Sequence, residues 1–425
     1  MATIAIIAIG SRGDVAPLTG VGLRLQQAGH RVIVVAYQAF ADLVIGCGLE
    51  FRGLDDDLDD TSADLSDISA REAAKAMAVF LSPRGMRELG DRVLAAVRDD
   101  PPEVLLLSPF AELAGHPLAD ALAIPSIGVR LQPSSATAEY PPAVLGAWSA
   151  GRFGNRAAAR IGESLIDGLY GKAVNHFRAQ LDLPRASART LRRRRSDARW
   201  PILYGYSPTV LPRPSDWRPG IDVVGYWWPA RPTGWQPPTE LAAFLDAGPP
   251  PVVIGFGSTV NSSAEAEQLS ALVAQAVSDA GVRAVIQAGW AGLDSYGDDM
   301  IAIGEVPHDW LFARAAAVVH HCGAGTTAAG LRAGVPAIAA PGAYGDQPFW
   351  ARRLFSLGIS PRPIPQRRLT ADNLGSAIRD VLSDGRFRDH AARVAAAVAA
   401  EDGAGQVLRG VENALEQTPP NPRFR

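Results

Sequence analysis

The sequence has 425 residues, of which 47% are hydrophobic and 20% charged, and its formal net charge is −3. This length predicts two domains, and the composition is that of a globular protein. The small negative charge argues against a nucleic-acid partner, and two cysteines exclude a disulfide framework.

The first residues predict a strand rather than a targeting segment. Residues 1–10 lack a basic n-region, and their apolar run covers only residues 4–9. No apolar stretch approaches the roughly 20 residues that a membrane-spanning helix requires. We therefore expect a cytoplasmic protein without an integral membrane segment.

The first half of the chain alternates apolar strands with helices. Strands are predicted at residues 4–9, 31–36, 102–107 and 125–129, and helices at residues 17–28 and 114–123. Gly29 is placed to end the first helix. Apolar strands separated by helices indicate βα units around a buried parallel sheet.

The second half opens in the same way, with a strand at 252–255, a Gly-Phe-Gly-Ser turn and a helix at 264–280. Further strands are predicted at 284–287, 300–303, 316–319 and 337–340, and a helix at 386–415. The pattern predicts a domain over 1–215, a Pro- and Trp-rich linker over 216–250, a second domain over 251–400 and a C-terminal helix and tail over 401–425. Ligands would bind at the carboxyl ends of the strands. The arginine run 192–195 favours a solvated interdomain loop over a site for an anionic partner.

Residues 320–347 form the most informative segment. An apolar strand runs into His-His-Cys-Gly-Ala-Gly-Thr-Thr, after which residues 328–333 favour a helix. A strand that breaks at small residues and opens a helix presents unpaired N–H groups and the positive end of the helix dipole, which suits a phosphate. The segment lacks both the dinucleotide fingerprint and the lysine of a P-loop. An ordinary strand-to-helix turn is the alternative.

This segment resembles the nucleotide-sugar signature of GT-B glycosyltransferases, particularly the bacterial natural-product (glycopeptide- and macrolide-type) and sterol branch. The matching pieces are His321-Cys322-Gly323, Gly325-Thr326, Gly334-Val335-Pro336 and Asp346-Gln347-Pro348. The resemblance implies an α/β fold of GT-B type, with two Rossmann-like domains whose parallel sheets face a central cleft. It also implies that the C-terminal helix packs back on the first domain.

The resemblance also assigns the donor site. It implies that the diphosphate is held by His321 and by the turn of Gly323, Ala324, Gly325 and Thr326. Asp346 and Gln347 would bind hydroxyls of the transferred sugar. Ser258 would reach the same phosphates, and Val306 lies in a loop that meets the base through its backbone.

Several of these positions have structural alternatives. Ser258 could be a plain turn serine, and Thr326 and Asp346 could each cap a helix. Many plant members carry a ribose-binding Glu where this chain has Ala329, so this site does not separate UDP from dTDP donors.

Asp14 is the predicted catalytic base. It follows a strand in a Gly-flanked loop, and an Asp near its reference pKa is ionised at neutral pH and can accept a hydroxyl proton. The Ser-Arg-Gly-Asp form resembles the sterol and glycopeptide branch, in which Asp takes the place of the plant His. The alternative is that Asp14 caps a helix that begins near Pro17.

His320, His321 and Cys322 raise the question of a zinc site. Neighbouring residues of a strand point to opposite faces, so these side chains cannot easily converge on one ion. We expect His320 to be packed or hydrogen-bonded at the strand end and His321 to face the phosphates.

The sequence thus predicts an inverting glycosyltransferase that moves a hexose or deoxyhexose from a UDP- or dTDP-sugar to an apolar aglycone of polyketide, macrolide or sterol type. The leaving diphosphate would be met by the helix after Thr326, by His321 and by Ser258, so no metal or other cofactor is expected. The alternatives are a nucleotide-sugar 2-epimerase on the same scaffold and a non-catalytic auxiliary protein that binds nucleotide sugar or a partner enzyme. Monomer and homodimer both remain open.

Acceptor residues are the least readable part of the site. Aromatic and methionine side chains of the first domain either line an apolar pocket or fill the core. They are Met77, Phe80, Met86, Phe110, Tyr140 and Trp148.

Overall fold

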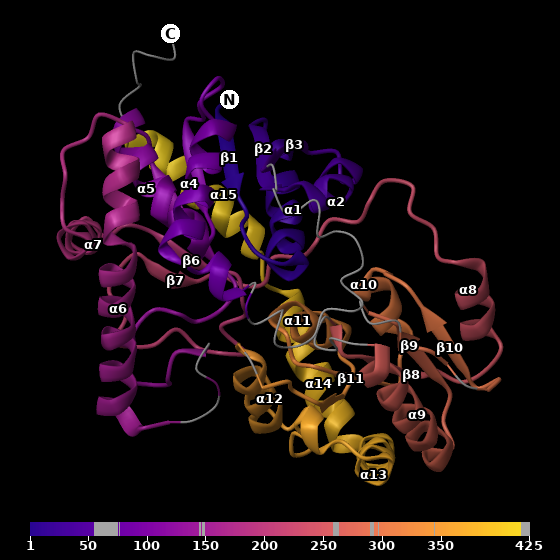
Figure 1. The fold of residues 1–425 in the computed structure, drawn as a ribbon. Coiled ribbons are helices and arrows are strands. Elements are labelled where there is room, and N and C mark those ends of the chain that lie inside the picture. Colours follow the sequence, from indigo (N-terminus) through magenta and orange to yellow (C-terminus); the bar gives the residue numbers. More distant parts are fainter. Residues whose placement is uncertain are drawn as a thin grey trace.

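The computed structural model describes residues 1–54, 75, 77–143, 146, 149–257, 263–289, 293–295, 297–343 and 345–417. Within these ranges the chain forms two parallel β-sheets flanked by helices, one sheet from each half (Figure 1). The predicted α/β architecture with two parallel sheets is therefore confirmed.

The first sheet has seven strands in the order β3-β2-β1-β4-β5-β6-β7, and every neighbouring pair is parallel. The strands are β1 (Thr3–Ile7), β2 (Arg31–Tyr37), β3 (Glu50–Leu54), β4 (Val104–Leu107), β5 (Ser126–Arg130), β6 (Ile202–Tyr204) and β7 (Ile221–Val223). The helices around it are α1 (Arg12–Gln27), α2 (Ala41–Gly46), α4 (Pro83–Ala96), α5 (Glu112–Leu122), α6 (Gly151–Gln180) and α7 (Ala188–Asp197), with short 3₁₀ turns η1 (Gln38–Phe40) and η4 (Pro109–Ala111).

The second sheet has five strands in the order β10-β9-β8-β11-β12, again all parallel. The strands are β8 (Val252–Gly255), β9 (Ala284–Gln287), β10 (Met300–Ile303), β11 (Ala317–His320) and β12 (Ala337–Ala339). The helices of this half are α8 (Thr239–Asp246), α9 (Ser263–Ala280), α10 (His308–Leu311), α11 (Ala324–Ala333), α12 (Gln347–Ser356), α13 (Ala371–Ser383), α14 (Gly385–Ala399) and α15 (Gly403–Gln417), with 3₁₀ turns η7 (Phe312–Arg314) and η8 (Gln366–Arg368).

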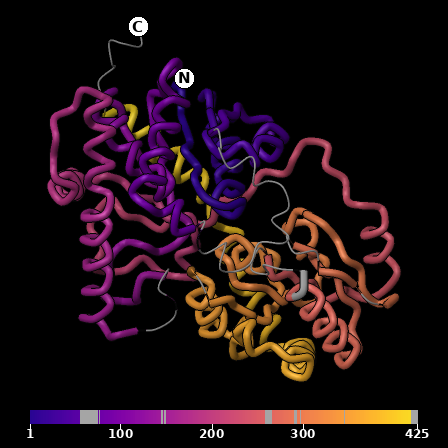
Figure 2. The backbone as a smooth tube through the Cα atoms, in the orientation of Figure 1, coloured from indigo at the N-terminus to yellow at the C-terminus, as the bar shows by residue number. Residues whose placement is uncertain are grey.

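The C-terminal helix belongs spatially to the first sheet. The predicted helix 386–415 is two helices, α14 and α15, which are separated at residues 400–402. At the break, a Cβ on Gly403 would lie 2.5 Å from the carbonyl oxygens of Gly225 and Tyr226, so only glycine permits this approach. Beyond it, Val407 and Val411 of α15 enter the core beneath the first sheet, and the yellow helix runs beside the indigo N-terminal strands (Figure 2).

Two stretches read as irregular in sequence contain regular elements. The arginine run 192–195, predicted as a solvated interdomain loop, lies in α7, and Arg192 pairs with Glu163 and Asp167 of α6. That prediction is wrong because the acidic partners are distant in sequence. The stretch 216–250, predicted as a linker, contains strand β7, which pairs with β6, and helix α8. No helix in the described ranges is both long and apolar enough to cross a membrane.

Candidate active site

The first turn of α11 forms an open helix end directly after β11. Gly323 is the N-cap residue, with φ −61° and ψ 149°, and no side chain of the described residues caps the helix. The first backbone bond runs from the Thr327 N–H to the Gly323 carbonyl at 2.9 Å. The N–H groups of Ala324, Gly325 and Thr326 therefore have no hydrogen-bond acceptor within the helix. Such N–H groups at a helix start are the ones that bind anions.

This helix begins earlier than the sequence suggests. The prediction placed it from residue 328, whereas α11 starts at Ala324. Thr326 is thus the third helical residue, and the alternative that it caps the helix is wrong. Thr327 is buried, and its hydroxyl has no hydrogen-bond partner in the described part of the chain.

His321 lies between two glycines at the mouth of α11. A Cβ at Gly257 would lie 2.8 Å from its Cε1 atom, and a Cβ at Gly323 would lie 2.5 Å from its Nε2 atom. Gly257 also has a positive φ of 59°, which glycine tolerates best. The ring is therefore packed between the turn after β8 and the start of α11.

This packing sets the charge of His321. Burial lowers its pKa to about 4, and the backbone of Gly255 offsets part of that shift. The imidazole is neutral at pH 7 and carries one N–H donor. Its Nδ1 atom is buried and, apart from the Gly255 backbone, has no hydrogen-bond partner among the described residues.

His320 and Cys322 turn into the core. The Nδ1 atom of His320 accepts a hydrogen bond from the Cys322 N–H at 3.1 Å, and burial lowers the His320 pKa to about 3. Cys322 has a φ of 64°, and its side chain is fully buried. The described residues contain no group of three His, Cys, Asp or Glu side chains that could hold a metal ion.

Asp346 and Gln347 stand at the start of α12, near the end of β12. Asp346 is the N-cap residue, but its side chain does not cap the helix. Its Oδ2 atom instead accepts a hydrogen bond from Trp350 Nε1 at 2.7 Å, and both side chains are buried. The capping alternative for Asp346 is therefore wrong. Gln347 Oε1 accepts a bond from the Gly342 N–H at 2.8 Å.

Asp14 lies in the first turn of α1 rather than in a loop. Ser11 is the N-cap residue, so the helix begins five residues before the predicted start. Asp14 Oδ2 accepts bonds from the Ser11 N–H at 2.8 Å and the Ser11 hydroxyl at 2.9 Å. Asp14 thus closes a capping box instead of serving as the N-cap. Burial raises its pKa, and the bonds from Ser11 oppose that rise.

The start of α1 and the loops of the second domain meet. Burial raises the pKa of Asp346 to about 6, the Trp350 bond opposes the rise, and the negative charge of Asp14 adds to it. An ion pair also joins Arg12 Nη1 to Glu305 Oε2 at 3.0 Å. Asp14 and Asp346, which are more than three hundred positions apart, therefore belong to one site.

Other predicted residues fall in different surroundings. Val306 is buried between β10 and α10. Ser258 lies outside the described residues, as does Trp148. Met86 is core, Phe80 and Phe110 pack edge-on at 5.5 Å, Tyr140 packs on Phe349 at 5.6 Å, and Met77 is exposed.

The sequence assigned no side-chain role to four residues of this site. Trp350 binds Asp346, and Arg12 pairs with Glu305. His308 lies with Nε2 3.3 Å from Gln287 Oε1 and stacks on Phe312. Burial lowers the His308 pKa to about 4, and the positive charge of Arg12, with that of His321 when it is protonated, lowers it further. Among these contacts, only that of Trp350 with Asp346 has a signal in the sequence, because residues four apart on a helix lie on the same face.

Comparisons with known proteins identify the family. The family described as erythromycin biosynthesis protein CIII-like, C-terminal domain, matches residues 270–413. O-mycaminosyltylonolide 6-deoxyallosyltransferase of Streptomyces fradiae is 34% identical over 416 residues, which are 97% of this chain and 95% of that protein. The chain belongs to this glycosyltransferase family.

Other proteins similar to this chain are also named glycosyltransferases. Sterol 3-beta-glucosyltransferase UGT80A2 of Arabidopsis thaliana is 31% identical over 96% of the chain, which spans 64% of that protein's length. The glycosyltransferase of kitacinnamycin shares the fold with a TM-score of 0.69 and 22% identity over 97% of this chain and 99% of its own. The calicheamicin glycosyltransferase CalG4 also shares the fold, with a TM-score of 0.70 and 19% identity over 99% of this chain and 100% of its own. The GT-B fold is therefore established for this chain.

Proposed function

We propose that this protein is an inverting glycosyltransferase that moves a hexose or deoxyhexose from a nucleotide diphosphate sugar to a hydroxyl of an apolar small molecule. The observation that carries the proposal is the open end of α11 beside the neutral imidazole of His321. Three backbone N–H groups that have no intrahelical partner and a neutral imidazole donor suit a diphosphate leaving group.

The donor sugar would lie between this cradle and the start of α12. Asp346 offers carboxylate oxygens, and Gln347 offers an amide, both of which hydrogen-bond sugar hydroxyls. Trp350 already engages one Asp346 oxygen at 2.7 Å and thereby orients the carboxylate. The backbone near Val306 would meet the base, and Ser258 would reach the phosphates.

The nucleotide is proposed to be dTDP or UDP. Two structural neighbours, SsfS6 and VinC, were solved with thymidine diphosphate, at TM-scores of 0.62 and 0.69. Their identities of 21% and 16% support only the shared fold, so the nucleotide choice rests on assay.

Asp14 would act as the general base. Its carboxylate is close enough to the second domain to influence Asp346, the proposed sugar ligand. An acceptor hydroxyl between them would lose its proton to Asp14 as its oxygen attacks the anomeric carbon from the face opposite the diphosphate. Charge on the leaving group would be met by α11 and His321, so we propose that no divalent ion is required.

The acceptor is proposed to be a polyketide, macrolide or sterol-like alcohol. Relatives are named for a sterol and for O-mycaminosyltylonolide. The 2-epimerase alternative required an acid and a base around the donor sugar, and none was evident near Asp346 in the sequence. The charge of Asp14 reaches Asp346, but the relatives are named glycosyltransferases, which favours transfer.

The test is incubation with UDP- and dTDP-hexoses and a panel of apolar alcohols, with products read by mass spectrometry and anomeric configuration by NMR. We expect transfer with inversion, and a fall in its rate of about ten- to a hundredfold in His321→Ala but not in the control His390→Ala on α14. Donor epimerisation without any acceptor, or no transfer to any alcohol, would contradict the proposal.

A further inference from the structure

The loop that carries the proposed base contact packs against the segment that links the two domains. Residues 304–307, here called the base loop, connect β10 to α10, and Val306 within it is buried. Trp310 of α10 packs edge-on against Trp235 of the linker, with ring centroids 5.6 Å apart. Both rings also pack against the apolar cluster that contains Val306. The linker therefore supports the base loop from outside its own sheet.

An ion pair joins the same two segments. Arg231 Nη2 lies 2.6 Å from Asp309 Oδ2, and the two side chains are 46% and 36% exposed. The Arg231 guanidinium also lies 5.7 Å from the centre of the Trp235 ring, within the range of a cation–π contact. Arg314 lies over the Trp310 ring at 4.4 Å and donates to the Trp310 carbonyl at 2.7 Å. Aromatic and charged contacts together thus fix α10, which directly follows the base loop.

The linker is itself anchored to the first domain beside these contacts. The Ala230 N–H donates to Thr19 Oγ1 of α1 at 2.9 Å, and the Thr233 N–H donates to the Gly46 carbonyl of α2 at 3.0 Å. The side chains that contact α10 belong to the same short segment, residues 230–235. This segment therefore joins α1 and α2 of the first domain to α10 of the second (Figure 1).

We propose that Trp235 and Arg231 are positioning residues for the nucleotide and hold the base loop in the conformation that receives the base. This inference rests on the proposed function, which places the base at Val306. A loop that is already ordered binds more tightly, because affinity falls in proportion to the population of the competent conformation. The diphosphate would be held by the start of α11 and by His321, which neither the ion pair nor the tryptophan contact includes. The two linker residues should therefore act on binding of the base and not of the phosphates.

The test is titration calorimetry with UDP, dTDP and inorganic pyrophosphate, because pyrophosphate can occupy the phosphate cradle but has no base. For each nucleoside diphosphate that the parent binds, we expect Trp235→Leu to lower the affinity about tenfold. The pyrophosphate affinity should change less than about twofold, since its contacts do not involve the base loop. Trp235→Phe should restore most of the loss, because it keeps an aromatic ring against Trp310.

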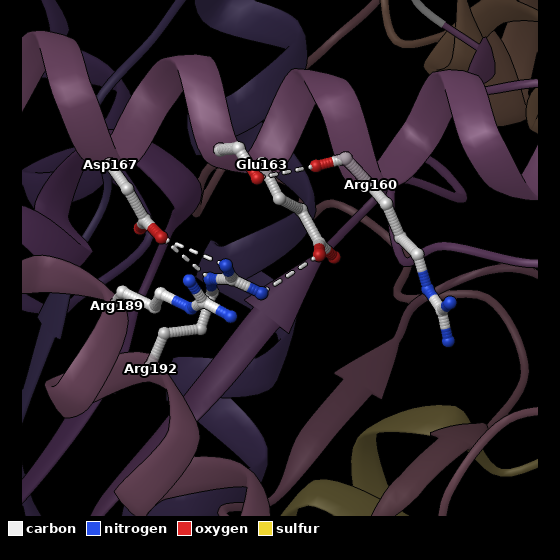
Figure 3. Close-up of a pocket in the computed structure, with 6 residues that line it drawn as sticks. Arg160, Glu163, Asp167, Arg189 and Arg192 are labelled. Atoms are coloured by element: carbon white, nitrogen blue, oxygen red, sulfur yellow. Dashed lines mark hydrogen bonds and ion pairs between the residues drawn. The ribbon is translucent and has the colours of Figure 1, made fainter.

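Arg231→Gln should have a smaller effect, about two- to fivefold on the nucleoside diphosphate, because an exposed ion pair is weak. Its difference from the parent should disappear when salt is raised from about 0.15 M to 1 M, since salt screens the pair. The matched control is Arg192→Gln, which breaks ion pairs between α7 and α6, at 3.0 Å to Glu163 and 2.9 Å to Asp167 (Figure 3). Its affinities should equal those of the parent at both salt concentrations.

The matched aromatic control is Trp200→Leu, which removes a partly buried indole that packs edge-on against His116, with ring centroids 4.5 Å apart. It should leave the ratio of nucleoside diphosphate affinity to pyrophosphate affinity unchanged. A parental ratio in Trp235→Leu, whether through no loss or through equal losses, would overturn the inference while the proposed function stands. So would the same change of ratio in Trp200→Leu. A parent protein that binds neither UDP nor dTDP would contradict the proposed function and the inference with it.

Discussion

Replacing Asp346 with Asn should stabilise the free protein at neutral pH. Burial raises the pKa of Asp346 from 3.8 to about 6, and its side chain is almost wholly inaccessible. The difference of roughly two pKa units corresponds to about 3 kcal/mol at most by which the ionised carboxylate destabilises the fold at pH 7. Asn carries no charge, and its oxygen can still accept the Trp350 bond.

The pH dependence of this gain follows from the direction of the shift. The folded protein binds more protons than the unfolded chain between about pH 4 and pH 6, so the Asp346 contribution to stability falls as pH rises through that window. The variant lacks this fall. Its advantage should therefore be near zero at about pH 4 and reach its plateau of up to about 3 kcal/mol above pH 6.

Urea unfolding of both proteins, without ligand, across this pH range measures the difference. The gain should shrink when Asp14 is already Asn, because the Asp14 charge contributes to the raised pKa. The same substitution should weaken nucleotide-sugar binding but leave free nucleotide diphosphate almost unaffected. An Asn variant that is no more stable at pH 7, or a gain that is independent of pH, would refute the reasoning.

Four further predictions concern the donor site. His321→Ala should lower donor affinity and turnover about ten- to a hundredfold in titration calorimetry and steady-state kinetics. The pKa of His321 is about 4, so this ring stays neutral between pH 5 and 8. The pH dependence of donor affinity over that range should therefore be the same in the parent protein and in His321→Ala. Trp350→Phe keeps a ring but removes the donor to Asp346, so nucleotide-sugar affinity should fall more than nucleotide diphosphate affinity, and equal losses would point to damaged packing. Turnover should survive EDTA; loss restored by Mg²⁺ would contradict the proposed metal-free leaving group.

Strand positions were largely predictable from the sequence. Three strands of the second half, β8, β9 and β10, have their predicted bounds, and the other predicted strands lie within two residues of theirs. Runs of buried β-branched and aliphatic residues bounded by glycine or proline are typical of buried strands, and few other structures fit them. The short strands β6 and β7 carry no such run, so the pattern could not separate them from loop.

The chemistry of the site was less predictable than its location. The turn after β11 is identifiable from its residues, whereas the start of α1 is not, because Pro17 favours a helix start there although Ser11 is the N-cap residue. The low pKa of His321 arises from packing against Gly257, which only the fold brings close. The pairing of Arg192 with α6 has the same origin.

The central claim is that Asp14 removes the acceptor proton while it also closes the first turn of α1. Asp14→Asn retains an oxygen for the Ser11 N–H but cannot accept a proton. General-base catalysis is typically worth about 10²–10⁴-fold, so kcat should fall by that order with donor affinity almost unchanged. Ser82→Ala is the matched control, because it removes a capping bond of another helix, the 3.1 Å bond from the Gly85 N–H at the start of α4, and leaves Asp14 and Ser11 unchanged; its kcat should stay close to that of the parent.

The decisive measurement is therefore kcat of Asp14→Asn with a weakly acidic alcohol and with an acidic phenol as acceptors. The account predicts a large loss with the alcohol that shrinks with the phenol, since an ionised nucleophile needs no base. An intact kcat accompanied by a lower melting temperature would contradict it and make Asp14 a structural residue of α1.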